Sequence, residues 1–319
     1  TMMRFLMIGA GGIGAYYAAR LLEAGHEVVL TARGPHLTAL QNDGLTVEHP
    51  EFSFQGPVTA MDHATLIATT EANQFDLIAI SLKAGATESV LNELDSWLTD
   101  QSTPILSLQN GVDNEPAIAN SIGNQRTIGG LAVRIGGHII KPGVIEAKGP
   151  AQVVMGAWPN AEQTPELQRQ LQPLADTLND AHIPTTLTDD IQYQLWRKLI
   201  INNGVNPLSA LTLLDTQKLT HHPAYGKAVY RMMEETATAA KADNVPLTKA
   251  DVDEMFELIS TFDAIKTSML VDREKGRPLE LEEICGAVLR RCAALGEDAP
   301  TTELVQALLK QELQNNDSE

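Results

Sequence analysis

The fold of this chain is decided near its start by the stretch FLMIGAGGIGAYYAARLL, residues 5–22. Residues 5–8 are apolar enough for a short buried strand, and residues 15–22 have the composition of a helix. Between them lies the pattern G-x-G-x-x-G, which forms a tight turn and brings the helix N-terminus and backbone amides to a pyrophosphate. We therefore predict a dinucleotide-binding loop, with a methyl-donor site as the main alternative. The loop consists of Gly9, Ala10, Gly11, Gly12, Ile13 and Gly14.

The end of the next predicted strand, residues 27–31, indicates which dinucleotide is bound. A protein that binds NAD carries Asp or Glu there, on the ribose hydroxyls, whereas this chain carries Ala32 and Arg33. A guanidinium can bind the 2'-phosphate of NADP through two hydrogen bonds, and the missing carboxylate removes a repulsion. We therefore predict NADPH rather than NADH as the cofactor. The alternative is that Arg33 is an ordinary solvated turn residue.

Two further apolar runs, residues 75–82 and 104–108, are suited to central strands of a parallel sheet. Ligands of such sheets lie beyond the carboxyl ends of the strands. Lys83 follows the first run and Asn110 the second, so both are candidate contacts of the cofactor or the substrate. Alternatively, Lys83 only caps a strand and Asn110 belongs to an Asn-Gly turn.

The rest of the chain predicts two domains. Short strands with Gly-rich turns over residues 127–158 indicate an antiparallel extension of the sheet, and an amphipathic helix over 164–179 and a strand over 183–187 follow. Further helices are expected over about 223–243, 248–260 and 280–295 and from residue 301 onward. The predicted fold class is α/β, with an N-terminal Rossmann-type dinucleotide-binding domain over residues 1–189 and an all-α domain over residues 190–319.

The second half begins with a helix-like stretch, LWRKLIINNGVNP, over residues 195–207. Its polar residues Lys198, Asn202 and Asn206 recur every four positions, so they share one helix face. The surrounding residues are apolar enough to lie inside a domain, and we expect the polar face to border a cavity or an interface. The alternative is that the sequence Asn-Asn-Gly at 202–204 ends the helix and that Lys198 reaches solvent.

Composition excludes several kinds of partner. The chain has 319 residues, with 23 Lys and Arg against 41 Asp and Glu and a formal net charge of -18, so neither nucleic acid nor an anionic membrane is expected to bind. No apolar run approaches the length of a membrane span. Cys285 and Cys292 are too far apart on a helix for a disulfide, which favours a cytoplasmic location. No metal is expected, because His221 and His222 are adjacent and do not share a helix face.

In combination and order, these motifs resemble the ketopantoate reductase family. The resemblance covers nearly the whole chain and rests on Gly9 to Gly14, Arg33, Leu82-Lys83-Ala84, Asn110-Gly111, Leu195-Trp196-Arg197-Lys198-Leu199, Asn202, Asn206-Pro207, Ser268-Met269-Leu270 and Glu280. It implies a Rossmann domain followed by a helical domain, with the active site in the cleft between them. The expected protein is a monomer or homodimer that acts on a small 2-keto acid.

The resemblance also implies roles for single residues. Lys198 matches the general acid of the family and Glu280 its substrate-binding carboxylate. The other matching positions hold the substrate or lie near substrate and nicotinamide: Asn202, Asn206 and Ser268, and Lys83 and Asn110. Lysine suits the reaction, because hydride transfer to a C2 ketone leaves negative charge on oxygen that an ammonium stabilises and protonates. Glu280 is expected to help keep Lys198 charged.

The implied reaction is the NADPH-dependent reduction of 2-dehydropantoate (ketopantoate) to (R)-pantoate in pantothenate and coenzyme A biosynthesis. Two features depart from the family pattern: Gln109 stands where some members carry His, and Glu282 and Glu283 make the segment after Glu280 unusually acidic. The alternatives are a paralogous reductase of another 2-keto acid and a non-catalytic NADPH-sensing protein. With a catalytic site, we interpret the poor helix formers at 202–204 as helix propensity given up for ligand contacts.

Overall fold

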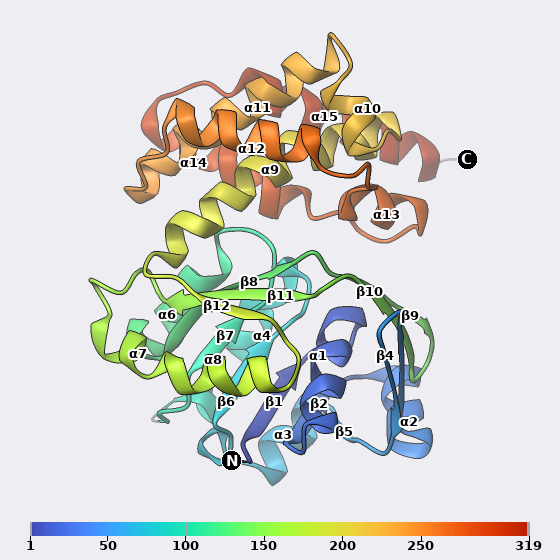
Figure 1. Ribbon diagram of the computed structural model, residues 1–319. Coiled ribbons are helices and arrows are strands. Elements are labelled where there is room, and N and C mark those ends of the chain that lie inside the picture. Colours follow the sequence, from blue (N-terminus) through green and yellow to red (C-terminus); the bar gives the residue numbers. More distant parts are fainter. Residues whose placement is uncertain (1, 100, 318–319) are drawn as a thin grey trace. The chain divides into compact units, whose positions relative to one another are not determined.

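The computed structural model describes residues 2–99 and 101–317, which belong to two compact units. One unit comprises Thr1–Asn110 and Asn114–Ile191, and the other comprises Gly111–Asp113 and Gln192–Glu319. The first is a mixed α/β unit and the second is helical (Figure 1). This confirms the fold class that the sequence predicts.

The α/β unit is built on an eight-stranded sheet with the order β12-β11-β8-β7-β6-β1-β2-β5. The strands are β1 (Arg4–Ile8), β2 (Glu27–Thr31), β5 (Thr59–Met61), β6 (Leu77–Ile80), β7 (Ile105–Ser107), β8 (Thr127–Val133), β11 (Gln152–Ala157) and β12 (Thr185–Leu187). All neighbours are parallel except β8 and β11, which are antiparallel. From β5 to β8 the order is that of a doubly wound dinucleotide fold, and it reverses between β1 and β6, where such folds bind their ligands.

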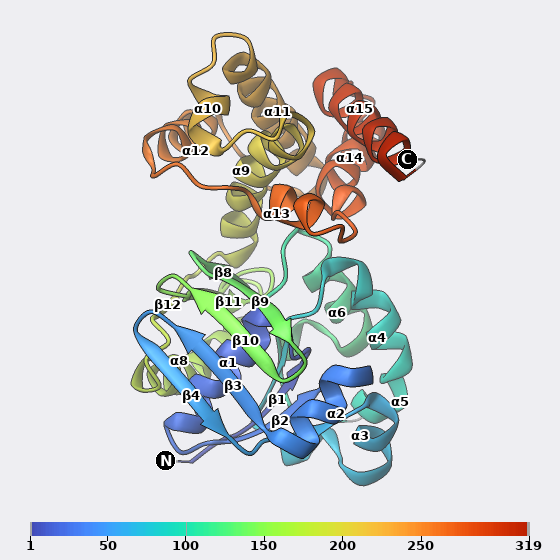
Figure 2. The same ribbon diagram turned by 90° about the vertical axis from the view of Figure 1, so that its right-hand side faces the viewer.

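Helices cover both faces of this sheet because its central strands are apolar on both sides (Figures 1 and 2). Phe5 and Met7 of β1 belong to a core shared with α1 (Gly12–Glu23) and α8 (Leu171–Asp180). Leu6 and Ile8 point the other way, because successive side chains of a strand alternate. They pack in a second core with α3 (His63–Thr69), α4 (Thr87–Glu93), α5 (Asp95–Leu98) and α6 (Asn114–Ile122).

A second sheet of four strands has the order β4-β3-β10-β9. It consists of β3 (Leu45–His49), β4 (Phe52–Gly56), β9 (Gly136–Lys141) and β10 (Val144–Lys148). The predicted antiparallel extension is therefore only partly right, since β8 and β11 extend the large sheet but β9 and β10 leave it. Glycine permits this path: a Cβ on Gly12 at the start of α1 would lie only 2.0 Å from the carbonyl carbon of Gly137 in β9.

The helix predicted over residues 164–179 is two helices, α7 (Pro165–Arg169) and α8. Pro173 explains the break, because it has no N–H with which to continue the backbone hydrogen bonds from α7 into α8. Leu171, Leu174 and Leu178 of α8 are buried as their spacing predicts.

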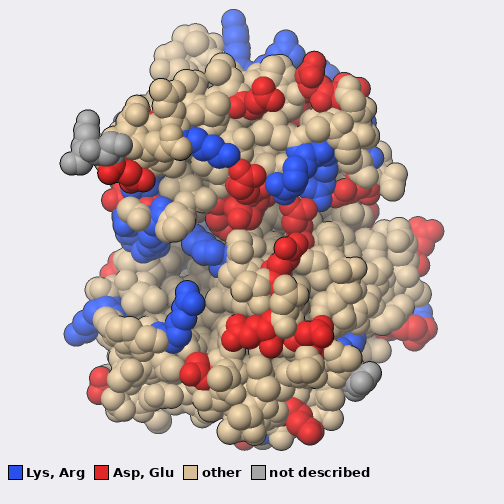
Figure 3. All heavy atoms as spheres, turned by 180° about the vertical axis from the view of Figure 1, so that it is seen from behind, with Lys and Arg blue, Asp and Glu red and all other residues tan. Residues whose placement is uncertain are grey.

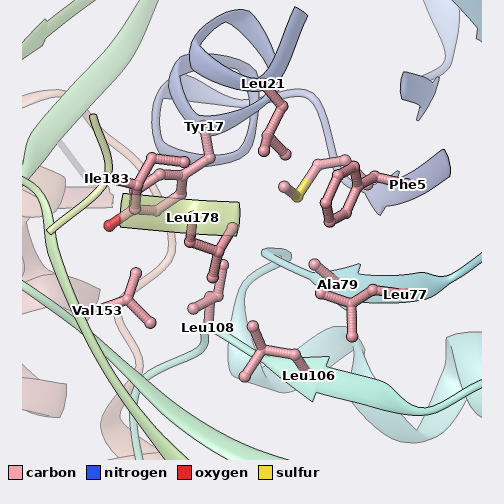
Figure 4. A pocket seen from close by; sticks show the side chains of 11 residues that line it. Phe5, Tyr17, Leu21, Leu77, Ala79, Leu106, Leu108, Val153, Leu178 and Ile183 are labelled. Carbon is pink, nitrogen blue, oxygen red and sulfur yellow. The ribbon is translucent and has the colours of Figure 1, made fainter. Parts of the chain in front are cut away.

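An apolar cavity of about 20 Å³ lies within the core that contains α1 and α8 (Figure 4). Its lining includes Phe5, Leu106, Val153 and Leu178, and the hydroxyl of Tyr17 at its edge donates a hydrogen bond of 3.0 Å to the carbonyl of Ala151. Burial raises the pKa of Tyr17, so the hydroxyl stays neutral. A cavity of this size and polarity is a packing defect that stays dry rather than a ligand site.

The helical unit contains the helices predicted from the sequence and two short ones that were not. Its elements are α9 (Ile191–Thr212), α10 (Thr216–Thr220), α11 (Tyr225–Ala240), α12 (Lys249–Thr261), α13 (Ser268–Glu274), a π-helical turn (Glu282–Gly286), α14 (Ala287–Leu295) and α15 (Pro300–Asp317). Asp215 and Thr267 cap the two unpredicted helices, α10 and α13. In the described part of the chain, no helix is both long and apolar enough to cross a membrane.

Charged side chains are distributed in a way that agrees with the acidic composition. On the face shown in Figure 3, Lys and Arg lie in separate groups among Asp and Glu and form no continuous basic surface. On this face, an anionic ligand would therefore meet single cations rather than a basic patch.

Candidate active site

The glycine loop follows β1 directly, and three of its glycines are required by the protein itself. Gly9 has φ of 106°, a conformation that favours glycine. A Cβ on Gly14 would lie 2.2 Å from the carbonyl oxygen of Gly9, and Gly12 is in tight contact with β9. A Cβ on Gly11, by contrast, would have no atom within 4 Å. The free space at Gly11, at the N-terminus of α1, fits the close approach of a pyrophosphate.

Two side chains at neighbouring strand ends hold Gly9 in place. The hydroxyl of Thr31, the last residue of β2, accepts a hydrogen bond of 3.1 Å from the amide of Gly9. The hydroxyl of Ser81, just after β6, donates to the carbonyl of Gly9, also at 3.1 Å. Neither residue was predicted from the sequence, because the only signal of each is a hydroxyl at the end of an apolar run.

Arg33 lies at the N-cap position of α2 (Gly34–Asp43), immediately after β2. Its side chain is exposed, and no ion pair within the described residues involves it. No carboxylate follows β2 before α2 begins. The guanidinium is thus available for an anion at the position where dinucleotide folds bind the ribose of the adenosine half.

Lys83 and Asn110 lie at the ends of the adjacent strands β6 and β7, and a buried network joins their backbones. The side-chain amide of Gln109 donates to the hydroxyl of Thr87 at 2.8 Å and to the carbonyl of Lys83 at 3.4 Å. The Thr87 hydroxyl donates to Asn114 at 2.8 Å, and Asn114 donates to the carbonyl of Asn110 at 2.7 Å. Gln109, the departure noted in the sequence, therefore fixes the two strand ends that carry candidate site residues.

In the helical unit, α9 presents the polar face that the sequence predicts. The helix is continuous through Gly204 and Pro207, so the alternative that it ends at 202–204 is wrong. Lys198, Asn202 and Asn206 consequently lie one turn apart along one side. Lys198 and Asn202 are half-buried, and Asn206 is only 4% exposed.

The interpretation of residues 202–204 as ligand contacts is wrong for two of the three. Asn203 is fully buried and donates to the hydroxyls of Thr236 in α11 and Thr302 in α15, at 3.0 and 3.1 Å. Gly204 lets α9 approach α11, because a Cβ there would lie 2.8 Å from Cγ of Met233. Helix packing explains Asn203 and Gly204, and Asn202 alone remains a candidate ligand contact.

Lys198 and Glu280 are electrostatically coupled. Glu280 is half-buried, and its carbonyl accepts the amide of Ile284 at 3.2 Å, in the turn that leads into α14. Burial lowers the pKa of Lys198 to about 8, and the negative charge of Glu280 opposes that change. Lys198 is therefore mostly an ammonium at neutral pH but releases its proton more easily than a solvated lysine, as a proton donor requires.

Other charged residues near these segments have structural partners. Arg197 pairs with Asp251 at 2.9 Å and with Glu254 at 2.6 Å, which ties α9 to α12. Glu282, one of the unexpected acids, pairs with Lys310 at 2.8 Å and lies 3.6 Å from Arg290. These cations offset the acidity of the segment after Glu280.

Ser268 is the first residue of α13 and is exposed, so its hydroxyl is accessible to a ligand. Thr267 precedes it as the N-cap and accepts a hydrogen bond of 3.1 Å from the amide of Leu270. The segment is thus fixed by its own cap, independently of any ligand.

The two histidines at the start of α11 bind backbone groups. His222 Nδ1 accepts the amides of Ala224 and Tyr225, both at 3.1 Å, and His221 Nε2 lies 2.7 Å from the carbonyl of Ser260. The described residues contain no cluster of three or more His, Cys, Asp or Glu that could hold a metal.

Both cysteines are free and buried. Burial raises the pKa of Cys285 to about 12 and that of Cys292 to about 11. Neither thiol is suited to be a nucleophile.

A glycine loop at the switch point of a doubly wound sheet, followed by a helical unit with a half-buried lysine, defines an NAD(P)-binding oxidoreductase. The sequence model described as "Ketopantoate reductase PanE/ApbA" matches residues 5–160, and that described as "Ketopantoate reductase PanE/ApbA C terminal" matches residues 190–314. The chain belongs to the ketopantoate reductase family, as its motifs indicate.

Individual relatives extend over the full chain. A 2-dehydropantoate 2-reductase of Pyrococcus horikoshii is 27% identical and covers 97% of each chain. The crystal structure of 2-dehydropantoate 2-reductase from Methylococcus capsulatus superposes with a TM-score of 0.85 at 27% identity, over 99% of this chain and 98% of that one. A structure of D-mandelate dehydrogenase with NADH and anilino(oxo)acetate gives a TM-score of 0.86 at 22% identity, over 98% and 99% of the chains. The last likeness concerns the fold alone.

Proposed function

We propose that this oxidoreductase reduces 2-dehydropantoate to (R)-pantoate with NADPH, a step of pantothenate and coenzyme A biosynthesis. The observation that carries the proposal is Lys198, a half-buried lysine with its pKa lowered to about 8 and a carboxylate, Glu280, coupled to it. The relatives named as 2-dehydropantoate 2-reductases support the choice of substrate. In this proposal residues 1–189 bind the cofactor and residues 190–319 bind the substrate.

Lys198 acts as the general acid. When bound, NADPH supplies the hydride, with its two electrons, to C2 of the ketone. Lys198 donates a proton from Nζ to the carbonyl oxygen as negative charge develops there, which gives the alcohol and leaves a neutral amine to be reprotonated from water. Glu280 favours the ammonium before the reaction. The amides of Asn202 and Asn206 and the hydroxyl of Ser268 hold the hydroxyl and carboxylate of the substrate without adding charge.

The choice of NADPH over NADH rests on Arg33. Its exposed guanidinium lies at the end of β2, where an NAD enzyme carries a carboxylate. In this proposal, Arg33 binds the 2'-phosphate, the glycine loop binds the pyrophosphate, and Lys83 and Asn110 lie near the nicotinamide end.

The first experiment measures initial rates of NADPH and NADH oxidation with a panel of 2-keto acids. We expect the highest kcat/KM for 2-dehydropantoate with NADPH. Robust turnover of another 2-keto acid and none of 2-dehydropantoate would show a paralogous reductase. Binding of NADPH without turnover of any keto acid would favour the sensing protein.

The variant Arg33→Ala tests the cofactor choice. We expect its KM for NADPH to rise about tenfold, because a charge-assisted bidentate contact is lost, with little change in KM for NADH. Arg231→Ala is the matched control, since Arg231 is also exposed but lies on α11 beside Glu234. Equal effects of Arg33→Ala on both nucleotides would contradict a contact with the 2'-phosphate.

A further inference from the structure

The glycine loop is held by a side chain that belongs to no recognised motif, His36 in the first turn of α2. His36 Nε2 lies 2.7 Å from the carbonyl oxygen of Ala10, the second residue of the loop. Nδ1 of the same ring lies 3.0 Å from the amide of Gly143, in the turn that joins β9 to β10. One imidazole therefore links α2, the glycine loop and a hairpin of the second sheet.

The hydrogen-bond partners determine which ring nitrogen carries the proton. The amide of Gly143 can only donate, so Nδ1 accepts and is unprotonated. The proton of the neutral ring is then on Nε2, which donates to the carbonyl of Ala10. Both ring nitrogens are satisfied by backbone groups, so the imidazole is locked in one orientation.

The bond to Ala10 fixes the peptide unit that contains the amide of Gly11. The carbonyl of Ala10 and the N–H of Gly11 belong to one planar group and point in opposite directions. Holding the carbonyl toward His36 therefore holds the Gly11 amide away from it. Gly11 is also the loop position beside open space. The same contact thus turns a carbonyl away from an incoming phosphate and presents an amide to it.

The hairpin supports the loop at a second point. β9 contacts α1, and Gly137 of β9 lies so close to Gly12 that neither position tolerates a Cβ without a shift of backbone. The hairpin therefore contacts the loop directly at Gly12 and through His36 at Ala10. Both contacts lie within the α/β unit.

We propose that His36 is a positioning residue for cofactor binding, which sets the phosphate-binding loop by its hydrogen bond to the carbonyl of Ala10. The inference rests on the proposed binding of NADPH. In this inference, the hydrogen bond of Nε2 to Ala10 supports cofactor affinity. The hydrogen bond between Nδ1 and Gly143 supports the packing of the hairpin.

The two bonds can be separated by two substitutions. The amide of glutamine can occupy the place of Nε2 and keep the donor to Ala10, whereas the oxygen of asparagine can occupy the place of Nδ1 and keep only the acceptor for Gly143. His49 provides a matched control, because it is also half-buried and also joins two backbone groups: Nε2 lies 2.7 Å from the carbonyl of Gly149, and Nδ1 accepts the amide of Glu51 at 3.1 Å. The ring of His49 also stacks on Tyr16 of α1, and none of these three partners belongs to the glycine loop.

The experiment measures Kd for NADPH by direct titration of the intact chain, together with Tm and with kcat at saturating NADPH. We expect His36→Asn to raise Kd about tenfold with kcat unchanged, His36→Gln to stay within about threefold of wild type, and His49→Asn to leave Kd unchanged. The asymmetry between His36→Gln and His36→Asn is a result that a purely structural role would not give.

Equal Kd values for His36→Asn and wild type would overturn the inference, as would equal losses in His36→Gln and His36→Asn. A rise in Kd for His49→Asn as large as that for His36→Asn would show that the effect is general loosening of the unit. Failure of the wild-type chain to bind NADPH would instead refute the proposed function.

Discussion

The two halves of the proposed site are built in opposite ways. In the α/β unit, the glycine loop offers backbone amides and empty space, and of its four glycines only Gly11 has room for a Cβ. In the helical unit, α9 offers side chains on a buried helix, and their roles depend on the neighbouring helices. A site formed by backbone groups can therefore be predicted from the spacing of glycines alone. A site formed by side chains can be predicted only when the packing of the neighbouring helices is known.

The contrast is sharpest for identical residues. Gly12 and Gly14 are required by contacts within the fold, whereas the fold leaves room for a Cβ at Gly11, so that only the proposed cofactor would require glycine there. Asn202 and Asn203 are adjacent in sequence, yet Asn203 holds α11 and α15 and Asn202 does not belong to that buried network. Two residues of the same type in one motif can thus differ in role, because one packs against the rest of its unit and the other does not.

The largest effect is expected for Lys198→Ala. Loss of the general acid should lower kcat by roughly 10²- to 10⁴-fold with either nucleotide, measured as the rate of keto-acid reduction. Lys198→Arg should fail to restore the rate, because guanidinium holds its proton too tightly to donate it. Lys218→Ala, an exposed lysine on α10, serves as the control. Activity of Lys198→Ala within a few-fold of wild type would assign the acid to another group.

Substitution of single glycines tests the part of the proposed site that the backbone of the glycine loop forms. Gly11→Ala should fold normally but raise Kd for NADPH by about 100-fold, since its methyl group occupies the space left for the pyrophosphate. Gly14→Ala should lower Tm or prevent folding, because its Cβ would lie 2.2 Å from the carbonyl oxygen of Gly9. The measurements are nucleotide titration and thermal unfolding. Unaltered NADPH affinity of Gly11→Ala would exclude this loop as the phosphate site.

Substitution of Asn202 and Asn203 tests the part of the proposed site that side chains of α9 form. Asn203→Ala should reduce the free energy of unfolding by about 1–3 kcal/mol, because the buried hydrogen bonds of its amide to α11 and α15 are lost. Asn202→Ala should leave that free energy nearly unchanged and raise KM for the keto acid about tenfold through loss of a substrate contact. Chemical denaturation and steady-state kinetics separate the two outcomes. An Asn202→Ala variant as unstable as Asn203→Ala would place both residues in the core.

The smallest effect is a displacement of the pH profile. As the proposed general acid, Lys198 must be protonated, so kcat/KM should be constant at low pH and fall as pH rises through about 8. Glu280 raises the pKa of Lys198 against the larger opposing effect of burial. Glu280→Gln should therefore move the falling limb to lower pH.

Glu282→Gln is the control for that experiment, because Glu282 pairs with Lys310 and Arg290 rather than with Lys198. Its profile should coincide with that of wild type. If kcat/KM of Glu280→Gln fell over the same pH range as that of wild type, a group other than Glu280 would keep Lys198 charged.

Much of the fold follows from local sequence. The strands β1 and β2, the glycine loop and the helices α11, α12 and α15 were predictable, because apolar periodicity and turn residues are local signals. The departure of β9 and β10 into a second sheet was not, since it depends on contact between Gly137 and Gly12.

The same limit applies to the candidate site. The spacing of Lys198, Asn202 and Asn206 correctly predicted one helix face, but spacing cannot show which asparagine meets a hydroxyl of another helix. His36, Thr31 and Ser81 escaped detection because their partners are carbonyls and amides distant in sequence. A hydrogen bond to a backbone group can be made to any residue type, so it leaves no recognisable pattern in the sequence.

The pairing of β3 with β10 has a consequence for the order in which the α/β unit folds. It joins Thr46 to Val144, about 100 residues further along the chain, and contacts of such separation form slowly. A chain emerging from the ribosome already carries the complete glycine motif when β10 has not yet been synthesised. The β9–β10 turn that contacts His36 is then missing, so the contacts of His36 and Gly12 with this hairpin form only after β9 and β10 have been synthesised.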